Sequence, residues 1–378
     1  MSGTDAPDFD GEDLPSPREN ARLQGHTAAE RTLLDAYNSG RLAHAWLFTG
    51  PRGIGKATLA YRFARFMLAH GKEAGEKDGG GLFGDALAPA PPNSLHLDPE
   101  HPVFRRVASG GHADFLAVER GVNEKTGKPR SEIVVDDVRS IGGIMSLTPA
   151  EGGWRAVVVD TADEMNRHAA NALLKVLEEP PARALVILVS HSPGRLLPTI
   201  VSRCWRLPLQ ALADDDVAAL LAAYRADLPA EDRADLVGLA EGSIGRALAL
   251  ADEGGVGLYR DLAALLVTLG QLDIGALHAL GDRVGRAGAE EAFLTVTDFL
   301  RWWLGRLILF AARGQVPPSA SSDDRALMER LAPAAALDRW LEVWEKINRL
   351  LARAGGANLD RKQVFLNAFF ALERAARH

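Results

Sequence analysis

The chain has 378 residues, a length that as a soft prior predicts two or three domains. Hydrophobic residues make up 47% of it and charged residues 25%, which is typical of a soluble globular protein. The formal net charge of −7 excludes a protein that is basic overall and wraps nucleic acid, although it leaves room for a local basic face.

The single cysteine, Cys204, excludes an intrachain disulfide and a cysteine-based zinc site, as expected in a reducing cytoplasm. The first residues, Met1–Pro17, are acidic and have no apolar core, so we do not expect a signal peptide. No apolar run is long enough to span a bilayer. We therefore expect a cytoplasmic protein with no membrane partner and a disordered leader over residues 1–19.

The chain then follows the order helix, strand, glycine-rich turn, helix. Apolar periodicity predicts a helix from about His26 to Ser39. The run Ala45–Phe48 predicts a buried strand, and Leu59–Leu68 predicts a second helix. Between them stands Gly50-Pro51-Arg52-Gly53-Ile54-Gly55-Lys56-Ala57-Thr58. A glycine-rich turn between a strand and a helix indicates a phosphate-binding loop, or P-loop.

The chemistry of this loop depends on its glycines and its lysine. Gly50, Gly53 and Gly55 let the backbone wrap closely around an anion, and the amides with the following helix N-terminus favour phosphate. Lys56 stands where a lysine reaches the outer phosphates of a nucleotide. We therefore predict a site for ATP or ADP in which binding is weak; the alternative is a vestigial loop kept as a backbone turn.

One position departs from the motif. The residue after the lysine is normally Ser or Thr, whose hydroxyl binds magnesium, and here it is Ala57. Thr58 comes one place later, and one step along a helix turns a side chain by about 100°. Thr58 remains a candidate nucleotide ligand, but we predict no metal site in a loop that is better suited to phosphate.

From about residue 70 to residue 111 the composition shifts toward glycine and proline, as in Gly79-Gly80-Gly81. Such residues argue against regular structure over much of the segment, which we interpret as an insertion on the domain surface. The spacing of His96, His101 and His112 matches no zinc pattern, and cysteines are absent there. We therefore expect surface histidines and no zinc.

Strands and helices alternate through the next hundred residues, which predicts a three-layer α/β domain with a parallel sheet. Ligands of such sheets bind at the carboxyl ends of the strands, so Gly50, Asp160 and Ser190 should converge. The predicted strands are Phe115–Val118, Ala156–Val159, Leu185–Val189 and Cys204–Leu207, and the predicted helices are Asp136–Leu147 and His168–Glu178.

Asp160 ends the strongest predicted strand, where a P-loop ATPase places an aspartate for magnesium; the alternative is an ordinary aspartate that caps a turn. An ATP-hydrolysing enzyme usually adds a glutamate directly after it to orient water, and here that residue is Thr161. Asp163 and Glu164 lie close by but in a different register. The losses at Ala57 and Thr161 together favour a site that does not turn over.

Two arginines stand at positions that predict contact with phosphate. Arg203, within Ser202-Arg203-Cys204, precedes the last strand and is placed to reach a neighbour's nucleotide as an arginine finger. Arg246 lies in the first turn of a predicted helix, where a positive charge opposes the helix dipole. For both, the alternative is a solvated surface charge. Cys204 itself is interpreted as a small buried apolar residue.

After Pro208 the pattern is helical to the end of the chain. We predict a nucleotide-binding domain over 20–208 with the insertion at about 70–111, a small helical domain over 209–254, and a helical domain over 255–378. Gly254-Gly255 is a predicted hinge between the last two. The C-terminal helices carry no cluster of catalytic residue types, so we assign them a structural or assembly role.

Three motifs resemble those of the bacterial clamp loader subunits of the AAA+ superfamily. They are the loop Gly50–Lys56, the run Asn171-Ala172-Leu173-Leu174-Lys175-Val176-Leu177-Glu178-Glu179-Pro180-Pro181, and Ser202-Arg203-Cys204. The resemblance covers about Arg22 to Arg246 and implies a P-loop AAA+ domain, a helical lid and an all-α collar. Many relatives carry a four-cysteine zinc module after the P-loop helix, which this chain lacks.

Within that family, Ala57 and Thr161 resemble the subunit that does not hydrolyse ATP and lends its arginine, here Arg203, to a neighbour. The resemblance implies gamma/tau motor subunits and a delta subunit as partners, with the sliding clamp and primed DNA contacted through the complex. Two alternatives stay open. One alternative is an active gamma/tau-like ATPase in which Thr58 or Asp163–Glu164 supplies the missing groups. The other is a stand-alone nucleotide-sensing regulator.

Overall fold

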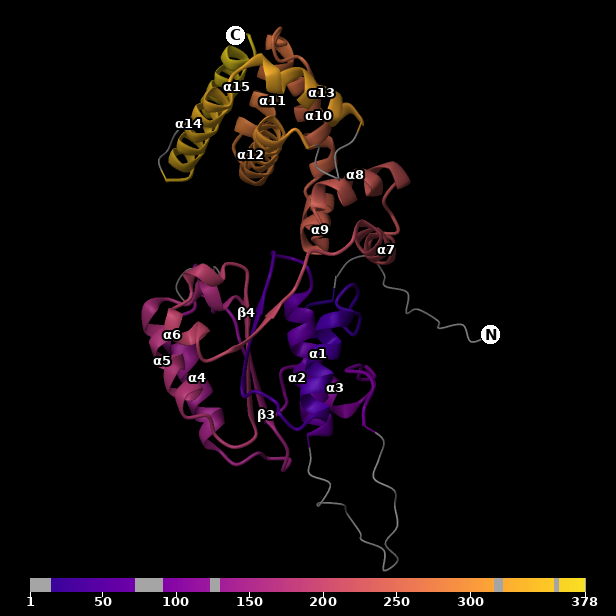
Figure 1. Cartoon of the computed structure of the whole chain (residues 1–378), viewed down its shortest axis with the longest axis vertical. Coiled ribbons are helices and arrows are strands. Elements are labelled where there is room, and N and C mark those ends of the chain that lie inside the picture. Colours follow the sequence, from indigo (N-terminus) through magenta and orange to yellow (C-terminus); the bar gives the residue numbers. More distant parts are fainter. Residues whose placement is uncertain (1–14, 72–90, 123–129, 316–321, 357–359, 378) are drawn as a thin grey trace, which may run out of the picture. The chain divides into compact units, whose positions relative to one another are not determined.

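The computed structural model describes residues 15–71, 91–122, 130–315, 322–356 and 360–377 (Figure 1). The chain forms two compact units. Unit 1 holds the described residues up to Tyr224 together with Gly242–Gly245, and unit 2 holds Arg225–Glu241 with Arg246 onward. The division into three domains at residues 208 and 254 stays a prediction.

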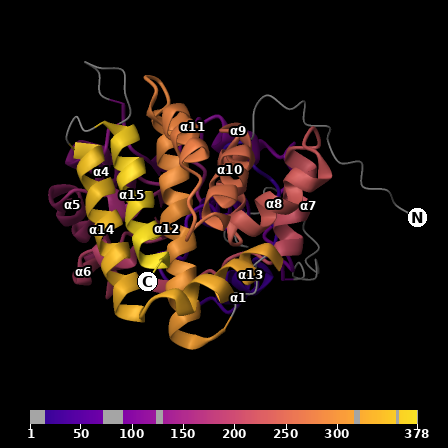
Figure 2. The ribbon, with the colours of Figure 1, turned by 90° about the horizontal axis from the view of Figure 1, so that it is seen from above.

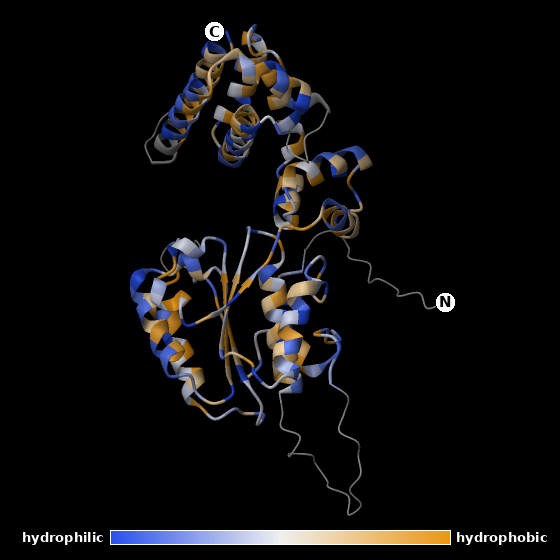
Figure 3. Ribbon diagram, in the orientation of Figure 1, coloured by the Kyte–Doolittle hydropathy of each residue, from blue (hydrophilic) through white to orange (hydrophobic). Residues whose placement is uncertain are grey.

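Unit 1 is built on a five-stranded parallel sheet with the order β2-β3-β4-β1-β5. The predicted parallel sheet is therefore confirmed, and β1 lies inside it between β4 and β5. Hydrophobic residues run along the central strands (Figure 3). The strands are β1 Ala45–Thr49, β2 Phe115–Val118, β3 Arg155–Val159, β4 Ala184–Ser190 and β5 Trp205–Pro208.

Helices cover both faces of this sheet, which gives the predicted three layers (Figure 1). Alternate strand residues serve opposite faces, since Ala156 and Val158 of β3 join one apolar cluster while Val157 and Val159 join the other. One face carries α1 Thr27–Asn38, α2 Lys56–His70 and α3 Pro102–Ala108; the other carries α4 Val135–Ser146, α5 Arg167–Glu178 and α6 Pro198–Val201.

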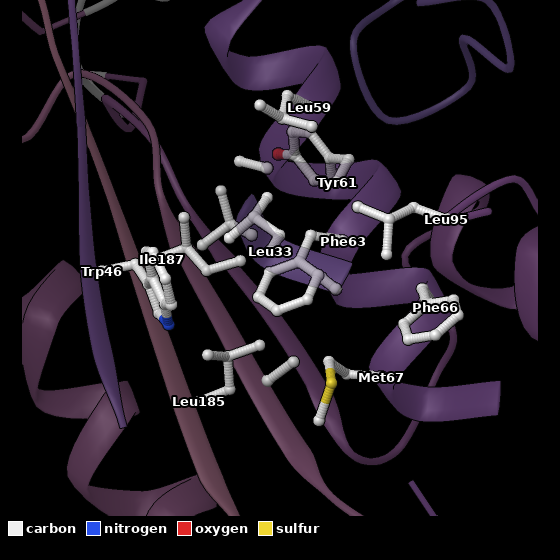
Figure 4. Packing of buried hydrophobic residues seen from close by; sticks show 14 of the residues in the cluster. Leu33, Trp46, Leu59, Tyr61, Phe63, Phe66, Met67, Leu95, Leu185 and Ile187 are labelled. Carbon is white, nitrogen blue, oxygen red and sulfur yellow. The ribbon is translucent and has the colours of Figure 1, made fainter. Parts of the chain in front are cut away.

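The helix after the P-loop, α2, is the apolar centre of the first face. Phe63, Phe66 and Met67 are each fully buried, and Figure 4 shows Phe63 and Met67 on the side of α2 that faces Trp46 and Leu185 of the strands. A fully buried large apolar side chain contributes about 1.5–3 kcal/mol to folding. This packing fixes the end of α2 at which Lys56 stands.

Part of the predicted surface insertion belongs to this core. Leu95, Val103, Phe104 and Val107 are 5% exposed or less, and Figure 4 shows Leu95 beside Phe66. Helix α3 was not predicted because the prolines of this segment, which include Pro102, argued against regular structure. A proline is favourable at the first helical position, where its missing N–H costs nothing. Residues 72–90 of the predicted insertion lie outside the described residues.

Part of the predicted leader is also structured. The guanidinium of Arg65 donates hydrogen bonds to the carbonyls of Arg18 (2.7 Å) and Asn20 (2.9 Å), so residues 15–19 are held on α2. Burial, with a contribution from the neighbouring Arg62, lowers the pKa of Arg65 to about 10. Residues 1–14 lie outside the described residues.

The described part of the chain after β5 is helical, as predicted, and Gly254 sits between two helices in the left-handed conformation. Trp344, a large apolar residue of these helices, is 39% exposed. No helix in the described ranges has the length and apolar character needed to cross a membrane. The helices are α7 Asp214–Tyr224, α8 Ala230–Ala240, α9 Ile244–Asp252, α10 Gly255–Val267, α11 Ile274–Gly285, α12 Glu290–Arg313, α13 Ser322–Leu331, α14 Leu337–Gly356 and α15 Arg361–Ala376.

Candidate nucleotide-binding site

The P-loop joins β1 to α2 and has the backbone that only glycine allows. Gly50 has φ +147° and Gly53 has φ +74°, values that L side chains rarely adopt. A Cβ atom added at Gly50 would lie 2.4 Å from the carbonyl oxygen of Leu209, and one at Gly53 would lie 2.4 Å from Ser243 Oγ. Gly55 is left-handed as well and directly precedes α2. These glycines permit a tight turn that other parts of unit 1 approach closely.

Lys56, the first residue of α2, is folded back onto the loop. The residue is only 3% exposed, and its Nζ donates to the carbonyl oxygens of Gly50 (2.8 Å) and Pro51. Burial lowers the pKa of Lys56 to about 8, although the carboxylates of Asp160 and Asp163 partly oppose that shift. The loop therefore presents one buried cation beside two acidic side chains.

The two residues after Lys56 face different surroundings. Ala57 packs against the apolar cluster of the first sheet face, where its methyl group offers no metal ligand. Thr58 is half-buried one step further along the helix. Among the described residues, no three His, Cys, Asp or Glu side chains gather in the manner of a metal site.

Asp160 stands at the end of β3, as the sequence predicted, and its surroundings are acidic. Its backbone N–H donates to the carbonyl of Val118 (2.9 Å) on neighbouring β2. Burial raises the pKa of Asp160 to about 6, with Glu119 adding to the rise, while the Thr161 amide and Lys56 oppose it. A carboxyl group with this pKa is mostly ionised at pH 7 and loses its charge as the pH falls through about 6.

Glu119 was missed by the sequence reasoning. It follows β2 directly and accepts hydrogen bonds from Tyr61 Oη (2.7 Å) and from Arg18 (3.0 Å). Burial and the Glu119 carboxylate raise the pKa of Tyr61 well above its usual range. The available signal was the position of Glu119 at the carboxyl end of a predicted strand next to that of Asp160.

Ser190 ends β4 opposite Thr49 of β1, so it lies at the same sheet edge as the P-loop. The backbone N–H of His191 donates to Asp163 Oδ1 (2.9 Å). Burial alone would raise the pKa of Asp163, but the hydrogen bond from the His191 N–H, together with the neighbouring Ser190 side chain, outweighs it and holds that pKa below its usual value. Burial, and next the charge of Lys56, lower the pKa of His191 to about 4, so its ring is neutral.

The segment Gly242–Gly245 of unit 1 rests on the P-loop. The Gly245 N–H donates to the carbonyl of Gly53 (2.9 Å), and Ser243 Oγ donates to the carbonyl of Arg52 (2.8 Å). The contact from Ser243 joins residues 191 positions apart and was not predicted from the sequence. The predicted residues Gly50, Gly53, Gly55, Lys56, Asp160 and Ser190 are thus gathered at one edge of the sheet.

The two predicted arginines pair with carboxylates outside this cluster. Arg203 follows α6, where its guanidinium pairs with Glu178 (2.8 Å) and donates to the carbonyl of Thr199 (3.0 Å), and its side chain is 36% exposed. Arg246 belongs to unit 2, where it lies 3.8 Å from the Glu241 carboxylate. The phosphate contacts assigned to both arginines remain predictions.

The structure also tests the interpretations of Cys204 as a buried apolar residue and of the histidines as surface residues. Cys204 is buried, and burial raises the pKa of its thiol to about 12, which keeps it protonated and supports the apolar interpretation. His112 was expected on the surface and is instead buried at 4% exposure, where its Nδ1 accepts the N–H of Asp114. His101 caps α3 by accepting the N–H of Val103.

Known proteins resemble this chain over the same region. The family described as DNA polymerase III, delta subunit, matches residues 25–213, half of the chain. DNA polymerase III subunit delta′ of Pseudomonas aeruginosa is 38% identical over 205 residues, which are 53% of each protein. Subunit tau of Escherichia coli is 27% identical over 330 residues, 83% of this chain and 46% of tau. The chain therefore spans about half the length of these two relatives.

A solved structure of a protein related to the DNA polymerase III gamma subunit, from Thermotoga maritima, matches 91% of this chain and all of its own length. The identity is 19% and the TM-score is 0.39. The P-loop α/β fold is established by this chain's own structure, independently of that match. Its evidence is the parallel sheet, the two helical layers and the glycine-rich loop after β1.

Proposed function

Because the chain belongs to the DNA polymerase III delta-subunit family within the AAA+ superfamily, we propose that it acts as delta-prime of the clamp loader. In this role it hydrolyses no ATP itself. It stands beside gamma/tau motor subunits and the delta subunit, and it helps to place a sliding clamp on primed DNA. The clamp and the DNA are contacted through the assembled complex.

The incomplete reaction centre is the observation that carries this proposal. The P-loop has its lysine, but the position of the metal-binding hydroxyl is taken by Ala57, whose methyl group packs against the core. After Asp160 the chain turns through Thr161, a left-handed residue with φ 58°, in place of a glutamate. A centre that lacks a metal ligand and a carboxylate to orient water is suited to holding a nucleotide without cleaving it.

Nucleotide binding itself is proposed to be weak. The Nζ atom of Lys56 already bonds to the carbonyls of Gly50 and Pro51, and a phosphate would have to displace both contacts. Binding to the folded state alone raises stability by RT ln(1 + [L]/Kd), about 2.7 kcal/mol at a hundredfold excess over Kd. A thermal shift with ATP or ADP that disappears in Lys56→Ala would identify the P-loop as the site.

Arg203 is the proposed contribution to a neighbouring subunit. It stands outside its own P-loop cluster and is held by Glu178 and Thr199 at a partly exposed position. An exposed ion pair of this kind contributes at most about 1 kcal/mol, so its guanidinium can exchange Glu178 for a phosphate at little cost. Arg246, in unit 2, is the second residue proposed to contact phosphate.

An active ATPase is the second candidate function, and the acidic residues near Lys56 favour it. Asp163 is 7% exposed with a pKa below its usual value, so it is ionised within the electrostatic reach of Lys56. Steady-state ATP hydrolysis by the pure chain decides between the two. We expect no appreciable turnover, whereas turnover at a motor rate that is lost in Lys56→Ala would establish the ATPase and overturn the delta-prime proposal.

Membership of the complex is tested separately. The chain is mixed with gamma/tau and delta subunits, and the products are separated by size. We expect one complex that contains all three and loads clamps on primed DNA. Failure of the chain to enter that complex would contradict the proposed function whatever its ATPase activity.

A further inference from the structure

A hollow of about 260 Å³ lies in unit 2 between α14 and α15. Figures 1 and 2 both show these two helices side by side. The hollow lies far along the sequence from the P-loop residues and shares none of them. We call it the α14–α15 groove and define it by its exposed lining residues Arg339, Glu342, Lys346, Arg349 and Arg374 and its buried lining residues Val343 and Ala371.

The exposed lining of this groove is strongly basic. Arg339, Lys346 and Arg349 follow one another at intervals of seven and three residues, which places them along one side of α14 over roughly 15 Å. Arg374 faces them from α15. This concentration of positive charge belongs to a chain whose net charge is −7, so it is a local feature.

Most of that charge is not neutralised by neighbouring acids. Arg339 pairs with Glu342, the one carboxylate that lines the groove, at 2.8 Å. Among the described residues, no carboxylate lies within the 4.0 Å ion-pair distance of Lys346, Arg349 or Arg374. Exposed cations that converge on a hollow without counter-charges repel one another, and an anion bound there relieves that repulsion.

The other lining residues of the groove limit what kind of anion fits. Val343 is 4% exposed and Ala371 is 5% exposed, so they offer little apolar surface to hold a hydrophobic side chain. None of the described residues that line the hollow is aromatic, so they offer no ring to stack on a base. Both walls are helices whose backbone groups bond internally, so a peptide strand cannot pair with them.

A run of phosphates meets these conditions best. Three of the four lining cations are arginines, whose planar guanidinium matches phosphate oxygens two at a time. A ligand with repeated charges along its length can contact a line of cations that extends over about 15 Å. A single compact anion is too short to contact all of them. A duplex presents its phosphates on a convex cylinder, whereas a flexible single strand can enter a hollow between two helices.

We propose that the α14–α15 groove binds the sugar-phosphate backbone of single-stranded DNA without reading its bases. The choice of DNA among polyanions rests on the proposed function, since this is the nucleic acid on which a DNA polymerase III subunit would work. The site itself rests on the groove and its cations. It gives unit 2 a nucleic-acid contact in addition to the assembly role predicted for its helices.

The test uses the full chain alone, without ATP, clamp or other subunits. A fluorescent oligothymidylate of about ten nucleotides is titrated and followed by anisotropy between about 50 and 200 mM salt. The groove variant is Lys346→Ala with Arg374→Ala. The matched control is Arg313→Ala with Arg325→Ala, which removes two exposed cations of unit 2 that do not line the groove.

We expect the slope of log K against log salt to fall by roughly 1.4 in the groove variant, about 0.7 for each lost phosphate contact. The control variant should keep the wild-type slope, and the charge-preserving pair Lys346→Arg with Arg374→Lys should keep most of the affinity. Circular dichroism checks that each variant is folded, so a loss of slope reports on the groove.

Three results would overturn the proposal. One is a wild-type chain that does not bind the oligonucleotide, and another is an equal loss in the groove and control variants. The third is a polyglutamate peptide that displaces the oligonucleotide as well as unlabelled oligothymidylate of the same charge, which would assign the groove to acidic protein segments. None of these results depends on clamp loading, so failure here leaves the delta-prime test untouched.

Discussion

Lys56 is held within the phosphate loop by the carbonyls of the loop itself, and this has a consequence for ligand exchange. The Nζ atom bonds to Gly50 and Pro51, and burial lowers its pKa to about 8. At neutral pH most of the population is therefore still charged and bonded to the loop. A phosphate that enters must compete with these internal acceptors, which explains why weak binding is expected from a loop with all its glycines.

Asp160 gives a pH-dependent prediction at the residue scale. Its pKa is raised to about 6 from 3.8, so the folded state binds its proton more tightly than the unfolded state does. Asp160 therefore stabilises the fold below about pH 4 relative to neutral pH, and this contribution is lost as pH rises through about 6. Asp160→Asn should raise the free energy of unfolding at pH 7 by up to roughly 3 kcal/mol, and by much less at pH 4.

Urea unfolding of both proteins at several pH values measures this difference. Asp163→Asn is the matched control of opposite sign, because hydrogen bonds hold the pKa of Asp163 below its usual value. Its carboxylate stabilises the fold above the unfolded pKa, so that variant should be less stable than wild type at pH 7. Equal effects of both substitutions at pH 7 would contradict the assignment of a raised pKa to Asp160.

Arg203 gives a prediction that appears in the chemistry of another subunit. Arg203→Ala should leave the fold and the complex intact, because an exposed pair with Glu178 contributes at most about 1 kcal/mol. ATP hydrolysis at one site of the assembled ring should fall by about 10³-fold or more, while sites with other fingers continue. Arg203→Lys should rescue poorly, since a point charge cannot reproduce the planar fork.

Clamp-stimulated and DNA-stimulated ATPase of a reconstituted complex measures this effect. Glu178→Ala is the control, since it breaks the same ion pair but keeps the guanidinium. We expect that control to hydrolyse ATP at the wild-type rate. If Arg203→Ala and Glu178→Ala behave alike, Arg203 has a structural role in unit 1 and the finger proposal fails.

At the scale of elements, the P-loop and the segment Gly242–Gly245 are fitted to each other. Gly53→Ala should destabilise the chain by roughly 1–3 kcal/mol, because it places a Cβ atom 2.4 Å from Ser243 Oγ on a left-handed backbone. Gly142→Ala is the control. Gly142 is exposed in the interior of α4, with nothing within 4 Å of the place its methyl group would take, so this change should stabilise by about 0.5–1 kcal/mol.

Thermal unfolding of the two variants beside wild type is sufficient to see opposite shifts. A Gly53→Ala protein as stable as wild type would mean that the segment yields easily and does not restrain the loop. Ser243→Ala, which removes the hydroxyl but keeps the space, separates the steric effect from the lost hydrogen bond to Arg52.

The elements that sequence predicted correctly are those with strong local signals. Fully apolar runs such as Ala156–Val159 and Leu185–Val189 identify central strands, because only a sheet covered on both faces buries every side chain. The carboxyl-end rule then placed Asp160 and Ser190 at the edge that carries the P-loop. This much of the candidate site follows from strand ends and one glycine-rich turn.

The elements that the sequence did not predict depend on distant partners. The leader residues near Arg18 are held by the side chain of Arg65, which projects from α2. No local sequence pattern predicts that contact. Glu119 and Tyr61 meet across 58 positions of sequence, and each looks ordinary alone. Helix α3 was not predicted from the sequence because a proline such as Pro102 can mark the start of a helix as well as its end.

At the scale of the whole molecule, the exposed apolar residues of unit 2 bear on assembly. Leu341 is 40% exposed and Trp344 is 39% exposed, and they stand three positions apart on one face of α14. Leu341→Glu with Trp344→Glu should leave the isolated chain folded but weaken its entry into a complex with gamma/tau and delta, because a desolvated charge opposes burial of that face.

Size-exclusion chromatography of the mixed subunits follows this change. Leu147→Glu serves as the control, since Leu147 is an exposed apolar residue (66%) of unit 1 and lies outside the C-terminal helices. We expect that protein to assemble normally. Undiminished assembly of the α14 variant would move the subunit interface away from this face.

The contact between Ser243 and Arg52 can form only late in the synthesis of the chain. The two residues are 191 positions apart, so the P-loop leaves the ribosome long before the segment that rests on it. At about 5–20 residues per second, the delay is roughly 10–40 seconds. During that interval the loop of a nascent chain lacks its covering segment, and a phosphate competes for Lys56 only with the carbonyls of Gly50 and Pro51. A nucleotide bound at this stage would be covered when Gly242–Gly245 folds onto the loop. Whether a finished chain contains nucleotide would then depend on what bound during synthesis, and not only on the affinity of the folded protein for nucleotide.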